Sequence, residues 1–595
     1  MSDQFEVQEG RWSMNRRALL RGGSLAVAGV AAAALIGCGS DDEEADSGSG
    51  GSTGTPAATG TAAASNVDQA PGLPYPFNFK EPDKAPKDGG TMTVGVAWDV
   101  STMDPSKSAA GGTITVPNIV YDRLIGFKSG IHYDRLKLEL KPELATSWER
   151  SPDGLVYTFK IRPGVKWQNV APLNGRAFVA SDAAFAYERY RKEGVHTAIW
   201  SDVDKIEAPD DATLKITLKK PLVDFINNLG GRYQTIFPKE LVENDAISKT
   251  PIGTGPMIFK EATPQQQVTF TKNPDYWQGK IHLDGWVFKI MPDIAARTAA
   301  FRAGQLDYAY SIAAKLSEAQ NIEKSMSGLQ MQITGGQAGG YGFGMNVQNA
   351  KFKDERVRRA VALAQDHQTT LQLVYEGLGV ALPDQFWTFV YDKEPSIQNG
   401  DLGQWNKWSG DAAEAKKLLE AAGASNLTID ATYYTYAGYD ATRPEVLTDQ
   451  FRRAGINFNA KKVEYTEFNS QWVGAKLAEA TTSGWGAPGF DADNYFYNQV
   501  HSTSPGNRHQ IKDAQIDQWA EQQRVELDPA KRKELLKNIW NRIWTDQMYR
   551  IPQSGGYAFE LYQPWLRGFR SGGPNGSSSY FYDWGEQVID MWLDK

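Results

Sequence analysis

The side chains that could carry out catalysis or bind a metal are few in this sequence, and their spacing suits neither task. None of the six histidines lies at the short spacing from another that zinc sites use. These histidines are His132, His196, His282, His367, His501 and His509. The sequence has no G-x-S-x-G elbow between a predicted strand and helix, and no phosphate-cradling G-x-x-x-x-G-K-[ST] loop. We therefore expect no enzymatic activity, no metal site and no cofactor.

Two closer pairs of polar side chains occur late in the chain. His501 and His509 flank Pro505-Gly506, and this turn signal predicts a surface loop. Asp491 and Asp493 would share one face of a strand but would diverge on a helix. As paired carboxylates, these two aspartates leave open a secreted hydrolase as an alternative.

The only cysteine, Cys38, ends an apolar run that begins at Leu25. Arg16 and Arg17 precede this run as the charged region of a secretory signal does, and the run is shorter than the roughly 20 residues that span a membrane. The ending Leu-Ile-Gly-Cys is similar to a bacterial lipobox, whose cysteine is acylated and becomes the mature N-terminus. We therefore predict a signal peptide at residues 1–37 and a lipid anchor on Cys38, on the extracytoplasmic face of the cell membrane.

The arginine pair also suggests an export route. The stretch 16–21, Arg-Arg-Ala-Leu-Leu-Arg, is similar to the twin-arginine signal, with Leu19 and Arg21 in place of its usual phenylalanine and lysine. Twin-arginine export would carry the protein across the membrane already folded. The general secretory route stays open as the alternative.

Composition narrows the class of protein further. Acidic side chains outnumber basic ones, 71 to 63, so no basic face for nucleic acid is expected. A single cysteine excludes a disulfide framework, and stability must come from packing. At 595 residues the chain is long enough for more than one apolar core.

The elements that must position these residues follow a low-complexity segment. Residues 38–87 are rich in Ser, Gly, Thr, Ala, Pro and acidic residues, which predicts a flexible tether. Alternating apolar residues predict strands at 89–96, 157–161 and 214–218. Helical spacing predicts helices at 354–375, 411–422 and 531–544, with Arg356, Arg358 and Arg359 toward solvent. Strands and helices intermix, so we predict an α/β (mixed α+β) fold.

A series of motifs after the predicted tether resembles the motifs of one known family. In order, they are residues 89–92, 102–105, 142–149, 151–159, 161–167, 180–185, 253–256, 273–277, 354–360, 412–423 and 484–487. Their succession is similar to that in the family 5 extracellular solute-binding proteins of ABC importers, the peptide- and nickel-binding group. The resemblance covers residues 88–595.

This resemblance implies a two-lobed, periplasmic-binding-protein-like clamp that closes on its solute. Lobe I would comprise residues 88–128, 222–335 and 545–595, with an accessory subdomain at 129–221, and lobe II would comprise 336–544. The implied protein is a monomer that captures an oligopeptide-like solute and delivers it to an ABC permease with its ATPase subunits. An oligosaccharide is the alternative solute.

The resemblance also implies where the solute is held. In peptide-binding relatives, an aspartate after a W-x-A motif pairs with the peptide α-amine, but here Pro488 follows Trp485-Gly486-Ala487. Asp491 and Asp493 match a second D-x-D element. Because a buried ammonium without a partner is costly, either Asp491 replaces the missing anchor or the preferred solute has no free amine.

Aromatic side chains are the remaining candidates for ligand contact. Trp485 could present a flat face at the cleft. Tyr341 and Phe343 lie in a glycine-rich stretch where the chain should re-cross between lobes, and Trp98 and Trp387 are weaker candidates. For each of these residues the alternative is a packing role in a core.

Overall fold

The structure of this protein is a computed structural model. It describes residues 5–8, 11–14, 84–100, 102–107, 115, 117–128, 139–195, 197–334, 343–382, 385–393, 395–434, 442–473, 475–482, 492–569 and 584–595.

The chain forms two compact units, Met1–Pro74 and Tyr75–Lys595. In the first unit, β1 (Phe5–Gln8) and β2 (Arg11–Met14) form an antiparallel hairpin. Arg16, Arg17 and Cys38 lie outside the described residues, as does the predicted tether as far as residue 83. All other elements belong to the second unit.

The last residues of the predicted tether contact the C-terminal end of the chain. Lys84 and Lys87 both form ion pairs with Asp594 near the C-terminus, and Lys84 Nζ lies 2.7 Å from its carboxylate. These pairs hold the pKa of Asp594 down, at about 2. The last residues of the predicted tether are therefore attached to the folded body by opposite charges that lie far apart in the sequence.

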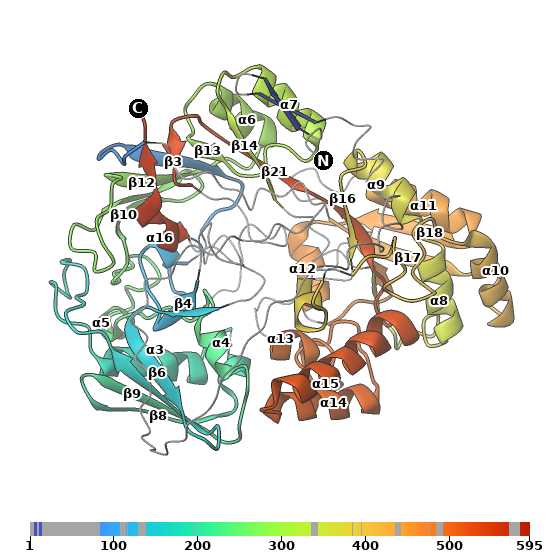
Figure 1. Ribbon diagram of the computed structural model, residues 1–595, viewed down its shortest axis with the longest axis horizontal. Coiled ribbons are helices and arrows are strands. Elements are labelled where there is room, and N and C mark those ends of the chain that lie inside the picture. The colour runs from blue at the N-terminus through green and yellow to red at the C-terminus, as the bar shows by residue number, and fades with distance from the viewer. Residues whose placement is uncertain are drawn as a thin grey trace, which may run out of the picture. The chain divides into compact units, whose positions relative to one another are not determined.

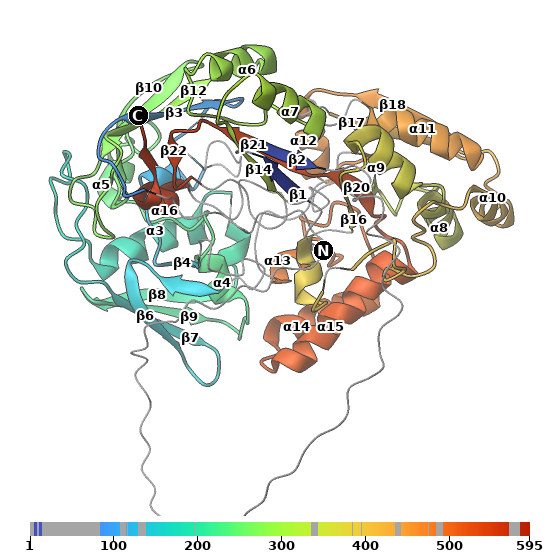
Figure 2. The same cartoon turned by 45° about the horizontal axis from the view of Figure 1, so that its top comes forward.

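A seven-stranded sheet organises the first part of the larger unit (Figure 1). Its strands, in spatial order, are β10 (Met257–Thr263), β11 (Gln267–Lys272), β12 (Gly285–Ile290), β3 (Thr91–Val96), β13 (Tyr308–Ala309), β21 (Ala558–Tyr562) and β14 (Gln330–Thr334). The alternating side chains Met92, Val94 and Val96 are fully buried, which confirms the predicted first strand. Helices α6 (Ile294–Arg302) and α7 (Leu316–Lys324) lie beside this sheet (Figure 2).

A separate antiparallel sheet of four strands lies within residues 145–218. Its order is β6 (Ala145–Arg150), β7 (Val156–Ile161), β9 (Thr213–Leu218) and β8 (Val203–Asp210), and α3 (Ala180–Lys192) contacts β8 and β9. Both strands predicted here are present. Gly154, at a φ of +74°, closes the turn between β6 and β7.

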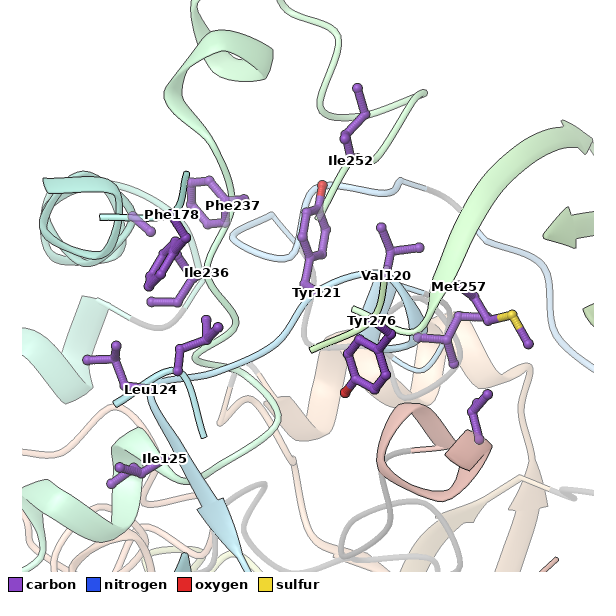
Figure 3. Packing of buried hydrophobic residues seen from close by; sticks show 14 of the residues in the cluster. Val120, Tyr121, Leu124, Ile125, Phe178, Ile236, Phe237, Ile252, Met257 and Tyr276 are labelled. Atoms are coloured by element: carbon purple, nitrogen blue, oxygen red, sulfur yellow. The ribbon is translucent and has the colours of Figure 1, made fainter. Parts of the chain in front are cut away.

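Short elements connect the two sheets. They are η1 (Pro117–Ile119), β4 (Ile125–Phe127), β5 (Leu140–Pro142), α4 (Phe225–Leu229) and α5 (Lys239–Glu243), whereas η3 (Thr197–Trp200) lies between α3 and β8. Figure 3 shows the apolar side chains packed around this connection, including Val120, Tyr121, Ile252 and Met257. Gly253 is required here by close approach, because a Cβ at this position would lie 1.9 Å from the carbonyl oxygen of Val120.

The later part of the chain builds another four-stranded sheet with helices around it. Its strands are β15 (Gly344–Met345), β19 (Ala480–Thr481), β17 (Thr428–Tyr433) and β18 (Asn457–Lys462). Its helices are α8 (Glu355–Leu363), α9 (His367–Tyr375), α10 (Ala412–Ala421), α11 (Arg443–Arg453), α12 (Tyr465–Val473), α13 (Ala492–Phe496), α14 (Ala514–Val525) and α15 (Pro529–Asn541).

Further short pieces complete the fold. They are β16 (Gly379–Leu382) paired with β20 (Gln553–Gly556), β22 (Leu566–Arg567) paired with β23 (Trp592–Leu593), α16 (Trp584–Gln587), and the short helical turns η5 (Gln385–Phe389), η6 (Arg542–Asp546) and η7 (Val588–Asp590). No helix in the described ranges combines the length and the apolar character that crossing a membrane would require.

The main buried apolar side chains form two separate cores. One core draws on residues from Met92 to Ile290, joined by Tyr308 and by residues from Tyr562 to Leu593. The other core draws on residues from Phe343 to Ile551. We call the two regions the first and second lobes, and they confirm the predicted mixed α/β, two-lobed fold class.

The predicted helix at 354–375 is in fact two helices. Helix α8 ends at Leu363 and α9 begins at His367, because Asp366 caps the second helix by accepting a hydrogen bond from Thr369 N at 2.8 Å. The solvent position expected for Arg358 was also wrong. Its guanidinium is buried and donates to the carbonyls of Phe352, Lys353 and Gln547.

Candidate functional site

One described strand segment passes directly between the two lobes. Strand β20 pairs with β16 in the second lobe, and after Tyr557 the chain continues as β21 in the seven-stranded sheet. Gly556 allows this passage, because a Cβ here would lie 2.3 Å from the ring of Tyr375. The segment therefore joins lobes whose apolar cores are separate.

On another part of the boundary, charged side chains from both lobes meet. We call these the inter-lobe cluster: Asp202 and Asp224 from the first lobe, and Asp493, Gln523, Arg524 and Arg532 from the second. Figures 1 and 2 both place α4, which follows Asp224, next to helices α13–α15. The cluster brings together side chains that lie far apart in the sequence.

Two arginines make the contacts across the boundary. Arg532 binds both carboxylate oxygens of Asp224, with Nη1 2.9 Å from Oδ1. Arg524 donates through Nη2 to Asp202 at 3.0 Å and through Nε to Asp493, in its own lobe, at 2.9 Å. Bidentate, charge-assisted contacts of this kind fix geometry as well as charge.

Backbone groups add to these contacts. Asp493 N donates to Asp224 Oδ2 at 2.9 Å, and Val223 N donates to the carbonyl of Arg524 at 2.9 Å. Burial raises the pKa of Asp493 to about 6, although the charge of Arg524 acts in the opposite direction and that of Asp224 adds to the increase. The cluster is thus desolvated and specific in its pairing.

A further contact between the lobes involves α7 and α9. Glu376, in the left-handed conformation at the end of α9, accepts hydrogen bonds from Ser317 N at 3.1 Å and Ser317 Oγ at 2.5 Å. Its carboxylate therefore accepts hydrogen bonds in the first turn of α7. The backbone N–H groups of a first turn have no acceptor within the helix, and negative charge is favoured there.

Two buried ionisable side chains lie near the strand that joins the lobes. Glu560, on β21, accepts a hydrogen bond from Tyr308 Oη at 2.6 Å, and burial raises its pKa to about 7. Arg443, at the start of α11, donates to Tyr375 Oη and to the carbonyl of Thr482 at 3.2 Å. Thr482 is the last described residue before the Trp485 segment.

Of the residues predicted to bind the solute, Tyr341, Trp485 and Asp491 lie outside the described residues, as does Pro488. Asp493 is described, and its carboxylate is engaged by Gln523 at 2.9 Å and by Arg524. The structure therefore gives Asp493 a place in the inter-lobe cluster, and its contact with a solute stays a prediction.

The three aromatic candidates in the described ranges pack against other residues. Phe343 is fully buried and lies edge-on to Phe451, with ring centroids 5.6 Å apart. Trp387 is buried in the second core, and Trp98 is half-buried against Phe288. All three therefore have packing contacts, and their contact with a solute stays a prediction.

The surface position predicted for His501 and His509 was wrong. Both imidazoles are buried: His501 stacks on Tyr497, and His509 lies edge-on to Trp472 and hydrogen-bonds the backbone of Met345. Burial, with the charge of Arg550, lowers the pKa of His509. The Pro-Gly turn signal was real, but tertiary packing covers the loop.

Sequence reasoning missed Asp202, Asp224, Arg524 and Arg532. Asp224 and Arg532 are 308 positions apart, so no local pattern links them. From the sequence, His367 was considered as a possible metal ligand, and its spacing from the other histidines argued against that role. It is buried beside Ser554, and desolvation lowers its pKa to about 4. Among the residues that the structure describes, no group of three or more His, Cys, Asp or Glu side chains could hold a metal ion.

Comparisons with known proteins agree on one family. The model described as "Bacterial extracellular solute-binding proteins, family 5 Middle" matches residues 139–507. Heme-binding protein A of Haemophilus influenzae is 27% identical over 422 residues, which cover 65% of this chain and 72% of the relative. Di/tripeptide-binding protein 2 of Pseudomonas aeruginosa is 25% identical over 501 residues, covering 78% and 90%.

A solved structure of a binding protein has a similar fold. The ABC transporter-associated periplasmic binding protein DppA of Helicobacter pylori, in complex with the peptide STSA, superposes with a TM-score of 0.70 at 25% identity. The match covers 86% of this chain and 99% of that one.

Proposed function

This chain belongs to the bacterial extracellular solute-binding proteins of family 5, and from that premise we propose that it captures a peptide-like solute between its two lobes. It then delivers the solute to an ABC permease powered by separate ATPase subunits. It acts as a binding protein rather than as an enzyme.

The observation that carries this proposal is the pairing of two separate apolar cores with a polar boundary between them. A boundary of hydrogen bonds and ion pairs can open at a small cost in apolar burial, whereas a shared core could not. The peptide class is supported by the di/tripeptide-binding relative, which this chain matches over 90% of its length. Because one fold accepts many solutes, the class rests on relatives rather than on fold.

This chain differs from the family at the position that recognises the α-amine of the peptide. Pro488 has no side-chain acceptor at the position of the family's aspartate, so Asp491 either takes over that contact or the amine is not recognised. Trp485 supplies a flat apolar surface to the solute.

The N-terminal segment supports a location at the membrane. We propose that the Arg16-Arg17 signal directs export and that a lipid on Cys38 then holds the protein near its permease. Replacing Cys38 by serine should release the protein from the membrane fraction in its host.

Isothermal titration against a peptide panel tests the proposed function. Each peptide is offered with a free and with an acetylated amine, and maltooligosaccharides are the matched control. We expect peptides to bind and oligosaccharides not to bind, with acetylation changing the affinity less than tenfold. Saturable binding of oligosaccharides in the absence of peptide binding would contradict the proposal.

A further inference from the structure

The inter-lobe cluster joins two lobes whose apolar cores do not merge. Leu222 and Phe225, on either side of Asp224, belong to the first core, whereas Ala520 and Leu536, near Arg524 and Arg532, belong to the second. Attraction between the lobes at this place therefore comes mainly from charges and hydrogen bonds.

The half of the cluster in the second lobe is complete without the first lobe. Gln523 receives Arg532 Nη2 on Oε1 at 2.9 Å and donates from Nε2 to Asp493 at 2.9 Å. Asp493 in turn holds Arg524, whose guanidinium carbon also lies 4.1 Å from the ring centre of Tyr497. Both arginines are thus held in place by contacts within their own lobe.

The first lobe supplies carboxylates that fit this preformed half. The side chain of Asp224 is only 2% exposed and that of Asp202 is 16% exposed when the lobes are together. Separation of the lobes would return both carboxylates to water while the arginines keep Asp493 and Gln523. Such an arrangement can open and close again without rearrangement of the second lobe.

We propose that the inter-lobe cluster is a charge latch that holds the two lobes together in the absence of solute and slows solute release. Its effect on solute release rests on the proposed function, whereas its effect on the lobes does not. Because a solute binds the closed form, loss of the latch lowers the closed population and raises the apparent dissociation constant by the same factor.

Pulsed electron–electron double resonance, which measures the distance between two spin labels, tests the latch in the solute-free full-length chain. Spin labels are attached through the substitutions Lys192→Cys and Lys417→Cys, in a chain whose own cysteine is removed by Cys38→Ser. Lys192 is 68% exposed in the first lobe and Lys417 is 72% exposed in the second. The variants are Asp224→Asn and Asp202→Asn. The control is Lys533→Met, which breaks the exposed Lys533–Asp392 pair next to Arg532 but within one lobe.

We expect a compact distance distribution in the parent protein and in the control, and a shift toward longer distances in both aspartate variants. The ratio of closed to open lobes should fall about tenfold. If Asp224→Asn fails to fold by circular dichroism, the more exposed Asp202→Asn decides the result. Distance distributions that are the same in the parent and in folded Asp202→Asn would overturn the latch, even if the protein binds peptides normally.

Discussion

At the scale of residues, Glu560 is a carboxyl group that folding makes expensive to ionise. Burial raises its pKa from 4.5 to about 7, so between these pH values the folded protein holds a proton that the unfolded chain has lost. The free energy of unfolding therefore decreases as the pH rises from about 4.5 to 7.

Glu560→Gln removes this cost and keeps an acceptor for Tyr308 Oη. We expect the variant to gain up to about 3 kcal/mol over the parent at pH 8, and to differ little at pH 4. Urea unfolding at the two pH values measures the difference. Equal stability changes at both values would contradict the assigned pKa.

His367 has the opposite sign of pH dependence. Its pKa is lowered from 6.5 to about 4 by burial, so between these values the unfolded chain binds a proton that the folded protein excludes. The stability that comes from His367 is present above pH 6.5 and is lost as the pH falls toward 4, by about 3 kcal/mol.

His367→Asn keeps a polar atom near Ser554 and removes the titration. The difference in unfolding free energy between parent and variant should therefore change by up to about 3 kcal/mol between pH 6.5 and pH 4. Groups common to both proteins, including Glu560, cancel in this difference. Parallel pH profiles would show that His367 is not the titrating group.

At the scale of elements, most strands and helices could be predicted because their signals are local. Alternation marked Met92, Val94 and Val96, and helical spacing marked α10 and α15, which Asp411 and Asp528 cap in the structure. The break between α8 and α9 was missed because the apolar spacing continues across it. The backbone of Asp366 is extended, and its side chain caps the start of a new helix.

Asp366→Ala tests that cap. Removal of the carboxylate leaves Thr369 N without its acceptor, and we expect a loss of about 1 kcal/mol in unfolding free energy. The control is Asp449→Ala on α11, which breaks exposed pairs with Arg452 and Arg453 and should cost less than loss of the cap. Guanidinium unfolding that gives equal costs for the two variants would contradict the capping role.

At the scale of the whole molecule, the fold class followed from an ordered set of motifs, but the boundary between the lobes did not. Asp202, Asp224, Arg524 and Arg532 come from distant segments and lie together only after both lobes have folded. Asp493 was predicted to contact the solute, and the structure shows its carboxylate paired with Arg524, so solute contact stays a prediction. Predictions for Trp485 and Asp491 depend on a solute that no sequence pattern specifies.

The central claim is that the lobes enclose a peptide-like solute. Native mass spectrometry of the protein purified from its own host, without refolding, tests it most directly. We predict an added mass that disappears on denaturation and fragments as a short peptide. An added mass that fragments as a carbohydrate, or a protein that remains at its unliganded mass when peptides are supplied, would contradict the claim.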